Sequence, residues 1–220
     1  MLSAENLASI ETDGLRIGQA IRESPGTPVP QYPGWTLEDM ANHLGWVHGR
    51  IVLICRDHPQ ERISGPRCPP GTPVIDWYDQ TLDELLEALE ASDPSTPVFG
   101  FGTTVTIGFW ERRMTIETGV HRWDVDQTLG VPGGLSDLVA VLGLDEYADI
   151  WLGYLGDVIP LTATATDLGR VWEMGEGKTR ATIEATASDI YLRLMARPSP
   201  VVLPDDWATA VDSLPPPPKL

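Results

Sequence analysis

Apolar residues recur every three or four positions along the first 130 residues, and this spacing predicts amphipathic helices. Apolar faces of this kind occur at residues 3–23, 36–56, 76–92 and 109–130. The second helix has a clear start, because Thr36 suits the N-cap and Asp39 can complete a capping box. Gly130 is a suitable stop for the fourth helix. Four helices with mostly antiparallel connections predict an up-down bundle.

The connections between these helices are rich in proline and glycine. Four prolines between Ser24 and Pro33 predict an extended loop. The loop over residues 57–75 is long for a compact protein, so we expect either a lid over a site or a disordered segment. The stretch VFGFGTT, residues 98–104, lacks the lysine and the spacing of a phosphate-binding loop, and we interpret it as a linker.

After Pro132 the pattern changes to a mixture of helices and strands. Residues 135–155 are predicted to be helical, with Gly143 as a candidate break. A strand is expected within residues 158–166. The other expected elements are a hairpin of residues 170–174 and 179–185 around the turn GEGK, a helix at 187–197 and one or two helical turns within 204–214.

The predicted fold class is therefore α+β. We expect the four-helix bundle over residues 1–132, a small α+β module over residues 133–214 and a flexible tail over residues 215–220. The tail, PPPPKL, has a polyproline composition that favours fraying.

Composition excludes several classes of function. A formal net charge of −17 argues against binding nucleic acid or an anionic membrane surface, because phosphate binding needs clustered Lys and Arg. No apolar run is long enough for a transmembrane helix, and the first residues lack the pattern of a signal peptide. The chain has only two cysteines, Cys55 and Cys68, and they lack CxxC spacing. Two thiols in a chain of 220 residues fit a reducing compartment better than a disulfide scaffold. We therefore predict a cytoplasmic protein that contacts neither nucleic acid nor membranes.

Three side chains are candidates for a metal site. Glu117 and His121 are four residues apart, so they share one helical face. His43, next to the apolar face of the second helix, is the candidate third ligand. Three N/O ligands with an open fourth position are typical of a catalytic zinc-type site. The alternatives are a solvated Glu–His pair and a core-edge histidine bonded to a carbonyl, while His48 is expected on a different, exposed face.

Three stretches resemble a known family. WTLEDMANHLGWVHGR, with Trp35, Asp39 and His43, resembles the N-terminal motif of the maleylpyruvate isomerase-like, mycothiol-dependent proteins, a branch of the DinB-like metal-binding bundle superfamily. WERRMTIETGVHRWDVDQTLG resembles the family's second signature, and ASDIYLRLMAR resembles its last helix, which ends in an arginine, here Arg197. The resemblance extends over nearly the whole chain.

The resemblance implies a divalent metal, usually zinc, held by His43, Glu117 and His121. It also implies mycothiol as a thiol cosubstrate whose sulfur meets the metal and attacks a small electrophilic substrate. A bound cation favours this chemistry because it deprotonates a thiol at neutral pH.

Three further residues are candidates for supporting roles. We assign Asp124 to the cofactor site, where it either accepts the His121 ring proton or pairs with Arg122. Arg113 and Arg197 are candidate catalytic residues, Arg113 by orienting Glu117 or binding a carboxylate and Arg197 by holding a substrate carboxylate. Surface salt bridges are the alternative for both. Asp39, beside the helix cap, is expected to be structural.

Three functional hypotheses follow. The first is a metal- and thiol-dependent isomerase or S-transferase. The second is a metal-dependent hydrolase in which water takes the open position, although no extra general base is evident. The third is a small-molecule binding protein with a vestigial metal site, which retention of all three ligand positions argues against.

Overall fold

The computed structural model describes residues 4–101 and 103–215, and the chain divides between residues 132 and 133 into two compact units. We call these the N-terminal unit and the C-terminal unit. The first contains four long helices and the second combines helices with a three-stranded sheet, so the fold class is α+β, as predicted. Apart from Pro215, the expected tail lies outside the described residues.

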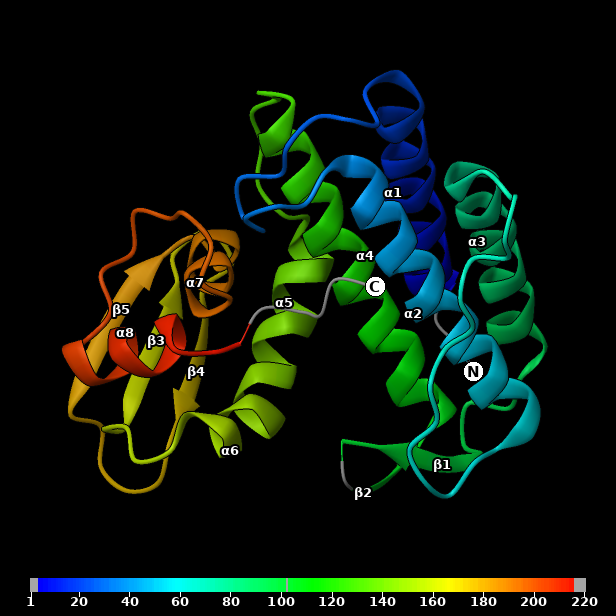
Figure 1. Ribbon diagram of the computed structural model, residues 1–220. Helices are drawn as coiled ribbons and strands as arrows, with labels where there is room; N and C mark the ends of the chain where they lie inside the picture. Colours follow the sequence, from blue (N-terminus) through cyan, green and yellow to red (C-terminus); the bar gives the residue numbers. More distant parts are fainter. Residues whose placement is uncertain (1–3, 102, 216–220) are drawn as a thin grey trace. The chain divides into compact units, whose positions relative to one another are not determined.

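The four predicted helices are all present in the N-terminal unit (Figure 1). They are α1 (Ala4–Glu23), α2 (Leu37–Asp57), α3 (Val74–Ala91) and α4 (Ile107–Thr128). Helix α2 packs mainly against α3, and α1 packs mainly against α4. None of the described helices has the length and apolar character needed to cross a membrane. The cytoplasmic location stays a prediction.

The starts of the two helices that carry the candidate ligands are fixed by side-chain caps. The Thr36 hydroxyl accepts from the Asp39 backbone N–H, and the Asp39 carboxylate accepts from Thr36 in return. This capping box confirms the structural role of Asp39. The Thr106 hydroxyl caps α4 by accepting from the Phe109 N–H. Gly130, with a φ of 69°, follows the end of α4 as predicted.

The segment interpreted as a linker is a β-hairpin instead. Strands β1 (Pro97–Gly100) and β2 (Thr103–Thr106) pair antiparallel, with Val98 opposite Val105. The hairpin is also tied to its surroundings, because the Phe99 carbonyl accepts from the Trp110 indole N–H at 3.1 Å. Tertiary contacts of this kind stabilise strands that are too short and glycine-rich to be predicted from their own sequence.

The C-terminal unit begins with helical structure and ends with it (Figure 1). Its elements are α5 (Asp137–Glu146), a π-helical turn (Tyr147–Trp151), α6 (Leu152–Leu155), β3 (Leu161–Ala165), β4 (Arg170–Met174), β5 (Ala181–Ala185), α7 (Ala187–Leu194) and α8 (Asp205–Asp212). Helix α8 confirms the expected helical turns after residue 204.

The predicted hairpin of residues 170–174 and 179–185 is wrong. The sheet order is β4-β3-β5, with β4 antiparallel and β5 parallel to the central strand β3. The backbone N–H groups of Arg180 and Ala181 both donate to the Pro160 carbonyl, which draws the chain across to the far side of β3. Local turn chemistry alone does not reveal such a crossover, because its partner strand lies earlier in the sequence.

Gly143 does not interrupt its helix. A Cβ atom placed on Gly143 would lie 2.3 Å from the ring of Tyr191, so the glycine allows α7 to approach α5 closely. The irregular segment comes later, at the π-helical turn that begins with the buried Tyr147. The predicted helix over residues 187–197 also ends early, because α7 stops at Leu194 and Ala196 has a φ of 58°.

Candidate metal centre

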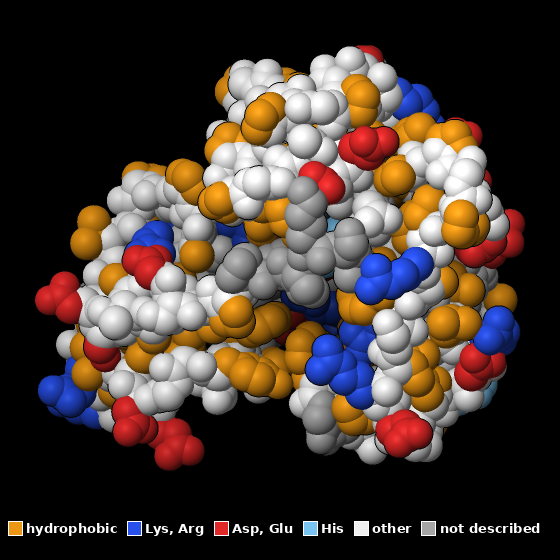
Figure 2. Space-filling view, in the orientation of Figure 1, with side chains coloured by type: hydrophobic (Ala, Val, Ile, Leu, Met, Phe, Trp, Pro, Cys, Tyr) orange, Lys and Arg blue, Asp and Glu red, His pale blue; other side chains and the backbone are white. Residues whose placement is uncertain are grey.

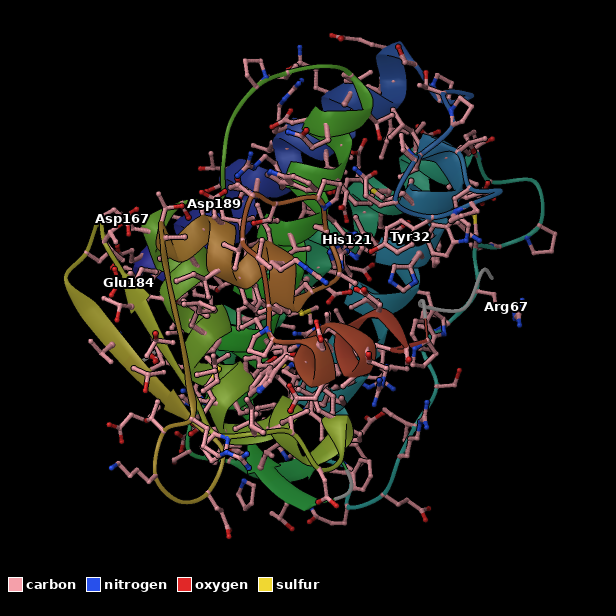
Figure 3. All side chains as sticks on the ribbon, turned by 90° about the vertical axis from the view of Figure 1, so that its left-hand side faces the viewer. Tyr32, Arg67, His121, Asp167, Glu184 and Asp189 are labelled. Carbon is pink, nitrogen blue, oxygen red and sulfur yellow. The ribbon has the colours of Figure 1, made fainter. Side chains whose placement is uncertain are left out.

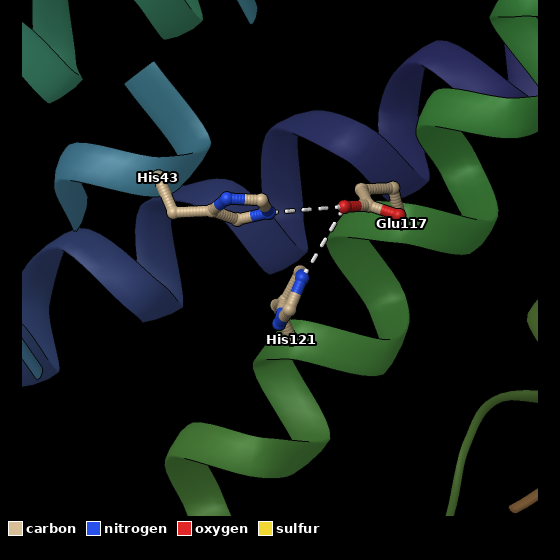
Figure 4. A group of neighbouring side chains, drawn as sticks. All are labelled: His43, Glu117 and His121. Atoms are coloured by element: carbon tan, nitrogen blue, oxygen red, sulfur yellow. Dashed lines mark hydrogen bonds and ion pairs between the residues drawn. The ribbon is translucent and has the colours of Figure 1, made fainter. Parts of the chain in front are cut away.

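His43, Glu117 and His121 converge on one point between α2 and α4 (Figure 4). One ligand atom from each lies within 4.8 Å of those of the other two. Glu117 Oε1 is central, at 3.6 Å from His43 Nε2 and 3.3 Å from His121 Nε2. The i,i+4 pair on α4 thus meets a histidine supplied by the facing helix, as the sequence predicts for a bundle.

The surroundings of these three side chains suit a divalent cation. The rings of His43 and His121 are only 4% and 3% exposed. Within the described residues, neither ring nitrogen of His43 makes a hydrogen bond. Buried polar atoms are normally paired, so an orphaned Nε2 that faces the Glu117 carboxylate at 3.6 Å indicates a missing partner. Two imidazoles and one carboxylate are the donor set of an open zinc-type site.

Arg113 holds the carboxylate of the cluster. Its guanidinium donates to Glu117 Oε2 at 2.6 Å, one helical turn away on the same face of α4. Burial alone would raise the pKa of Glu117, but the neighbouring Arg113 charge and the two imidazoles hold it well below its usual range. Glu117 is therefore ionised and ready to bind a cation, with Oε1 directed to the histidines and Oε2 to the arginine.

The opposite nitrogen of His121 faces a second carboxylate. His121 Nδ1 lies 3.2 Å from Asp124 Oδ2, and the Tyr32 hydroxyl donates to that same oxygen at 3.3 Å. Of the two partners weighed for Asp124, the structure brings it to His121, while Arg122 pairs with Asp126 and Asp13. Burial would lower the pKa of His121, but hydrogen bonds to Asp124 and Glu117 raise it to about 9.

Tyr32 is the residue that sequence reasoning missed. It lies in the proline-rich loop before α2 and contacts the His121 ring, with centroids 5.9 Å apart (Figure 3). Its ring also contacts Trp35 at 4.9 Å, and Trp35 contacts His43 at 5.4 Å. The one signal in the sequence was that two aromatic residues, Tyr32 and Trp35, occur in a loop otherwise rich in proline and glycine. Large apolar side chains in such a loop indicate that it packs against another part of the protein. These rings exclude water from one side of the cluster.

The prediction that His48 lies on the surface is wrong. The side chain is fully buried, and its ring lies 5.6 Å from the ring of Tyr78 on α3. Helix α2 is covered by neighbours on more than one face, so a position away from its main apolar stripe is also buried. Neither ring nitrogen of His48 makes a hydrogen bond within the described part of the chain. Burial lowers its pKa to about 3, so the ring is neutral in the folded protein.

Replacing His48 with Leu is expected to remove a loss of stability at acid pH. In the unfolded chain His48 takes up a proton near pH 6.5, whereas in the fold it does so only near pH 3. Between these pH values the unfolded state therefore binds more protons than the folded state. The contribution of His48 to the free energy of unfolding falls by about 1.4 kcal/mol per pH unit as the pH decreases. Urea denaturation of both proteins between about pH 7 and pH 4 measures this difference.

The matched control for this prediction is His58→Asn, which changes an exposed histidine at the left-handed C-cap of the same helix. Asn tolerates that backbone conformation, so this variant should keep the fold and the buried His48. The acid dependence of stability that His48 causes should therefore remain. An equally steep acid dependence in His48→Leu would contradict the burial of a neutral imidazole at this position.

Arg197, the other candidate catalytic residue, belongs to the C-terminal unit. It follows the end of α7, is partly exposed, and donates from Nη1 to the Met195 carbonyl at 2.8 Å. Arg193, on α7, pairs with Asp212 on α8. A catalytic role for Arg197 stays a prediction.

Comparisons with known proteins identify the family and the fold of the chain. The profile of the family described as "Mycothiol maleylpyruvate isomerase N-terminal domain" matches residues 7–126. Two crystal structures, of the mycothiol-dependent maleylpyruvate isomerase and of a histidine-to-alanine variant of it, are similar to this chain with a TM-score of 0.71 each. The alignments cover 97% of this chain and 95% of the other at 13% identity, so they establish a shared fold. No curated protein matches the sequence.

Proposed function

Because the chain belongs to the mycothiol maleylpyruvate isomerase N-terminal domain family, we propose that it is a metal- and thiol-dependent enzyme. The observation that supports this most is the meeting of three ligand atoms within 4.8 Å at a buried point of the bundle. His43, Glu117 and His121 would hold a divalent cation, with zinc the best match to two imidazoles and a carboxylate. Mycothiol is the proposed thiol.

The remaining residues of the site prepare these ligands. Arg113 keeps Glu117 ionised and fixes its orientation. Asp124, supported by the Tyr32 hydroxyl, holds His121 with Nδ1 turned away from the cluster and Nε2 turned toward it. Partners of this kind set the tautomer and direction of a ligand imidazole. Asp124 thus serves the cofactor site through His121, and Arg113 serves it through Glu117.

A divalent cation bound at this point would lower the pKa of a thiol, so that the thiol reacts as a thiolate at neutral pH. The thiolate sulfur adds to one carbon of a conjugated double bond, and the electron pair of that bond moves onto the conjugated carbonyl. The carbon–carbon bond is then single and can rotate. Expulsion of the sulfur restores the double bond in the opposite geometry and returns the thiol unchanged.

This sequence of steps makes isomerisation the first choice, and it agrees with the reaction in the family's description. S-transfer uses the same thiolate but keeps the new carbon–sulfur bond in the product. The two are separated by whether the thiol is consumed. Arg197 is the proposed carboxylate-binding residue of the C-terminal unit.

Calorimetric titration of mycothiol into zinc-loaded protein tests the proposal. We expect micromolar binding that disappears in the His43→Ala variant, and weak or absent binding of glutathione. Failure of mycothiol to bind the fully zinc-loaded protein would overturn thiol dependence and favour a hydrolase, in which water takes the open position.

A further inference from the structure

The face of α2 that carries His43 continues toward a second group of side chains. Trp46 and Arg50 follow His43 at the spacing that keeps residues on one helical face. The ring centroids of His43 and Trp46 are 6.4 Å apart. On α4, Trp110 lies seven residues before Glu117, which is two turns along that helix. Arg50 on α2 and Trp110 on α4 therefore each lie about 10 Å along the helix axis from a candidate ligand of the same helix.

The guanidinium of Arg50 lies over two aromatic rings. The central carbon of its guanidinium lies 5.3 Å from the ring centroid of Trp110 and 6.0 Å from that of Trp46. Its Nε atom is buried and makes no hydrogen bond within the described residues. An arginine in this setting keeps its charge, because the guanidinium does not lose its proton in proteins. Its planar donor fork is thus pre-positioned and unused.

Among the described residues Arg50 has no carboxylate partner, as is also true of Arg62, Arg67 and Arg112, but of these four only Arg50 has a buried nitrogen without a hydrogen bond. Within the described part of the N-terminal unit, five other arginines each pair with an Asp or a Glu. These are Arg16, Arg22, Arg56, Arg113 and Arg122. A chain with a net charge of −17 offers many acidic partners, so an arginine that is buried at Nε without one is unusual.

The loop between α2 and α3 brings a second positive charge to this place. A Cβ atom on Gly65 would lie 2.2 Å from the Trp46 carbonyl, so the loop is seated directly on α2. Arg62, an exposed residue of that loop, lies close enough to Arg50 for the two charges to repel. Basic side chains are visible on the face of the N-terminal unit that this loop crosses (Figure 2). Two neighbouring guanidinium groups, neither of them paired with a carboxylate among the described residues, favour an anion.

We propose that Arg50, whose guanidinium lies over the rings of Trp46 and Trp110, binds a carboxylate of a ligand that reacts at the His43–Glu117–His121 cluster. The statement that the ligand reacts at the cluster rests on the proposed function. The binding of a carboxylate by Arg50 does not depend on it. The carboxylate belongs to the electrophilic substrate, because mycothiol carries none: the carboxyl group of its cysteine is in amide linkage. A bidentate pair with the arginine fork would satisfy Nε and fix the ligand's orientation relative to the cluster.

Nuclear magnetic resonance of the arginine Nε–H groups tests this proposal on the zinc-loaded protein. The Arg50 signal is identified by its absence in Arg50→Lys. Succinate should shift this signal, while succinamide, its uncharged analogue, and sodium chloride at equal ionic strength should not. The dissociation constant for succinate, measured by calorimetry, should rise at least tenfold in Arg50→Met and in Arg50→Lys, because neither retains the planar fork.

Arg56→Met is the matched control, since Arg56 lies on the same helix, is exposed and already pairs with Asp57. It should bind succinate as the unmodified protein does. Zinc content should be unchanged in all three variants, which verifies an intact fold and cluster. An unmoved Arg50 signal, or equal succinate binding in Arg50→Met, overturns the proposal.

Titration of mycothiol into Arg50→Met is a further control, because mycothiol carries no carboxylate. Mycothiol binding should be unchanged in this variant, and weaker binding would contradict the assignment of Arg50 to a substrate carboxylate. If mycothiol fails to bind even the unmodified protein while succinate still shifts Arg50, the proposed function is refuted and the carboxylate site stands.

Discussion

Replacing Glu117 with Gln is expected to abolish tight zinc binding and, with it, any thiol-dependent activity. Glu117 Oε1 is the central atom of the cluster, within 3.6 Å of both histidines, and the substitution removes its negative charge while keeping its shape. Loss of a residue that merely supports a ligand costs about 10–100-fold in metal affinity, so loss of a direct ligand should cost more. Competition with a chelator of known affinity measures the change.

The control for this experiment is Glu111→Gln on the same helix. Glu111 is also buried, and its Oε1 accepts from the Asn6 amide, an interaction that a glutamine oxygen can preserve. Zinc affinity in this variant should match that of the unmodified protein. If Glu117→Gln retained full zinc affinity, the metal would have to bind elsewhere.

Zinc affinity is expected to rise steeply with pH up to about pH 9. In the metal-free protein the pKa of His121 is raised to about 9, so at neutral pH its ring carries a proton that zinc must displace. This requirement lowers the apparent affinity about tenfold for each pH unit below 9. Calorimetry at pH 7 in buffers of different protonation enthalpy should detect about one proton released from His121 per zinc ion.

The same proton stabilises the metal-free fold. Since the folded pKa of His121 lies above its unfolded value of 6.5, this contribution is fully present below about pH 6.5 and is lost as the pH rises through 9. Zinc binding and the metal-free fold therefore respond to pH in opposite directions over this range.

Asp124→Asn should flatten the pH dependence of zinc binding, because the amide no longer favours a protonated imidazole at His121. Asp126→Asn is the matched control, since Asp126 pairs with Arg16 and Arg122. A steep pH dependence that persisted in Asp124→Asn would assign the released proton to a different group.

The sequence was sufficient for the helices and for the Glu117–His121 pair because both depend on local periodicity. The i,i+4 spacing of Glu117 and His121 fixes their common face, and the family resemblance points to His43 on the facing helix. The capping box at Thr36 is equally local. Such features are encoded within one or two turns of a helix, so they survive without knowledge of the tertiary structure.

The features that sequence reasoning missed depend on contacts between distant segments. Burial of His48 follows from the ring of Tyr78 on α3, and the place of β5 follows from hydrogen bonds to Pro160. Tyr32 reaches Asp124 across 92 positions of the sequence. Neither hydrophobic period nor turn chemistry contains this information, because each side chain finds its partner only after the helices have packed.

The most direct test of a metal-activated thiol is the absorption spectrum of the cobalt-substituted protein. Cobalt(II) replaces zinc with the same donor set, and a sulfur atom bound to it produces an intense charge-transfer band. Addition of mycothiol should generate this band in the unmodified protein and leave Glu117→Gln unchanged. If mycothiol binds while the spectrum of the cobalt-loaded protein stays the same, the thiol does not meet the metal, and the proposed chemistry is wrong.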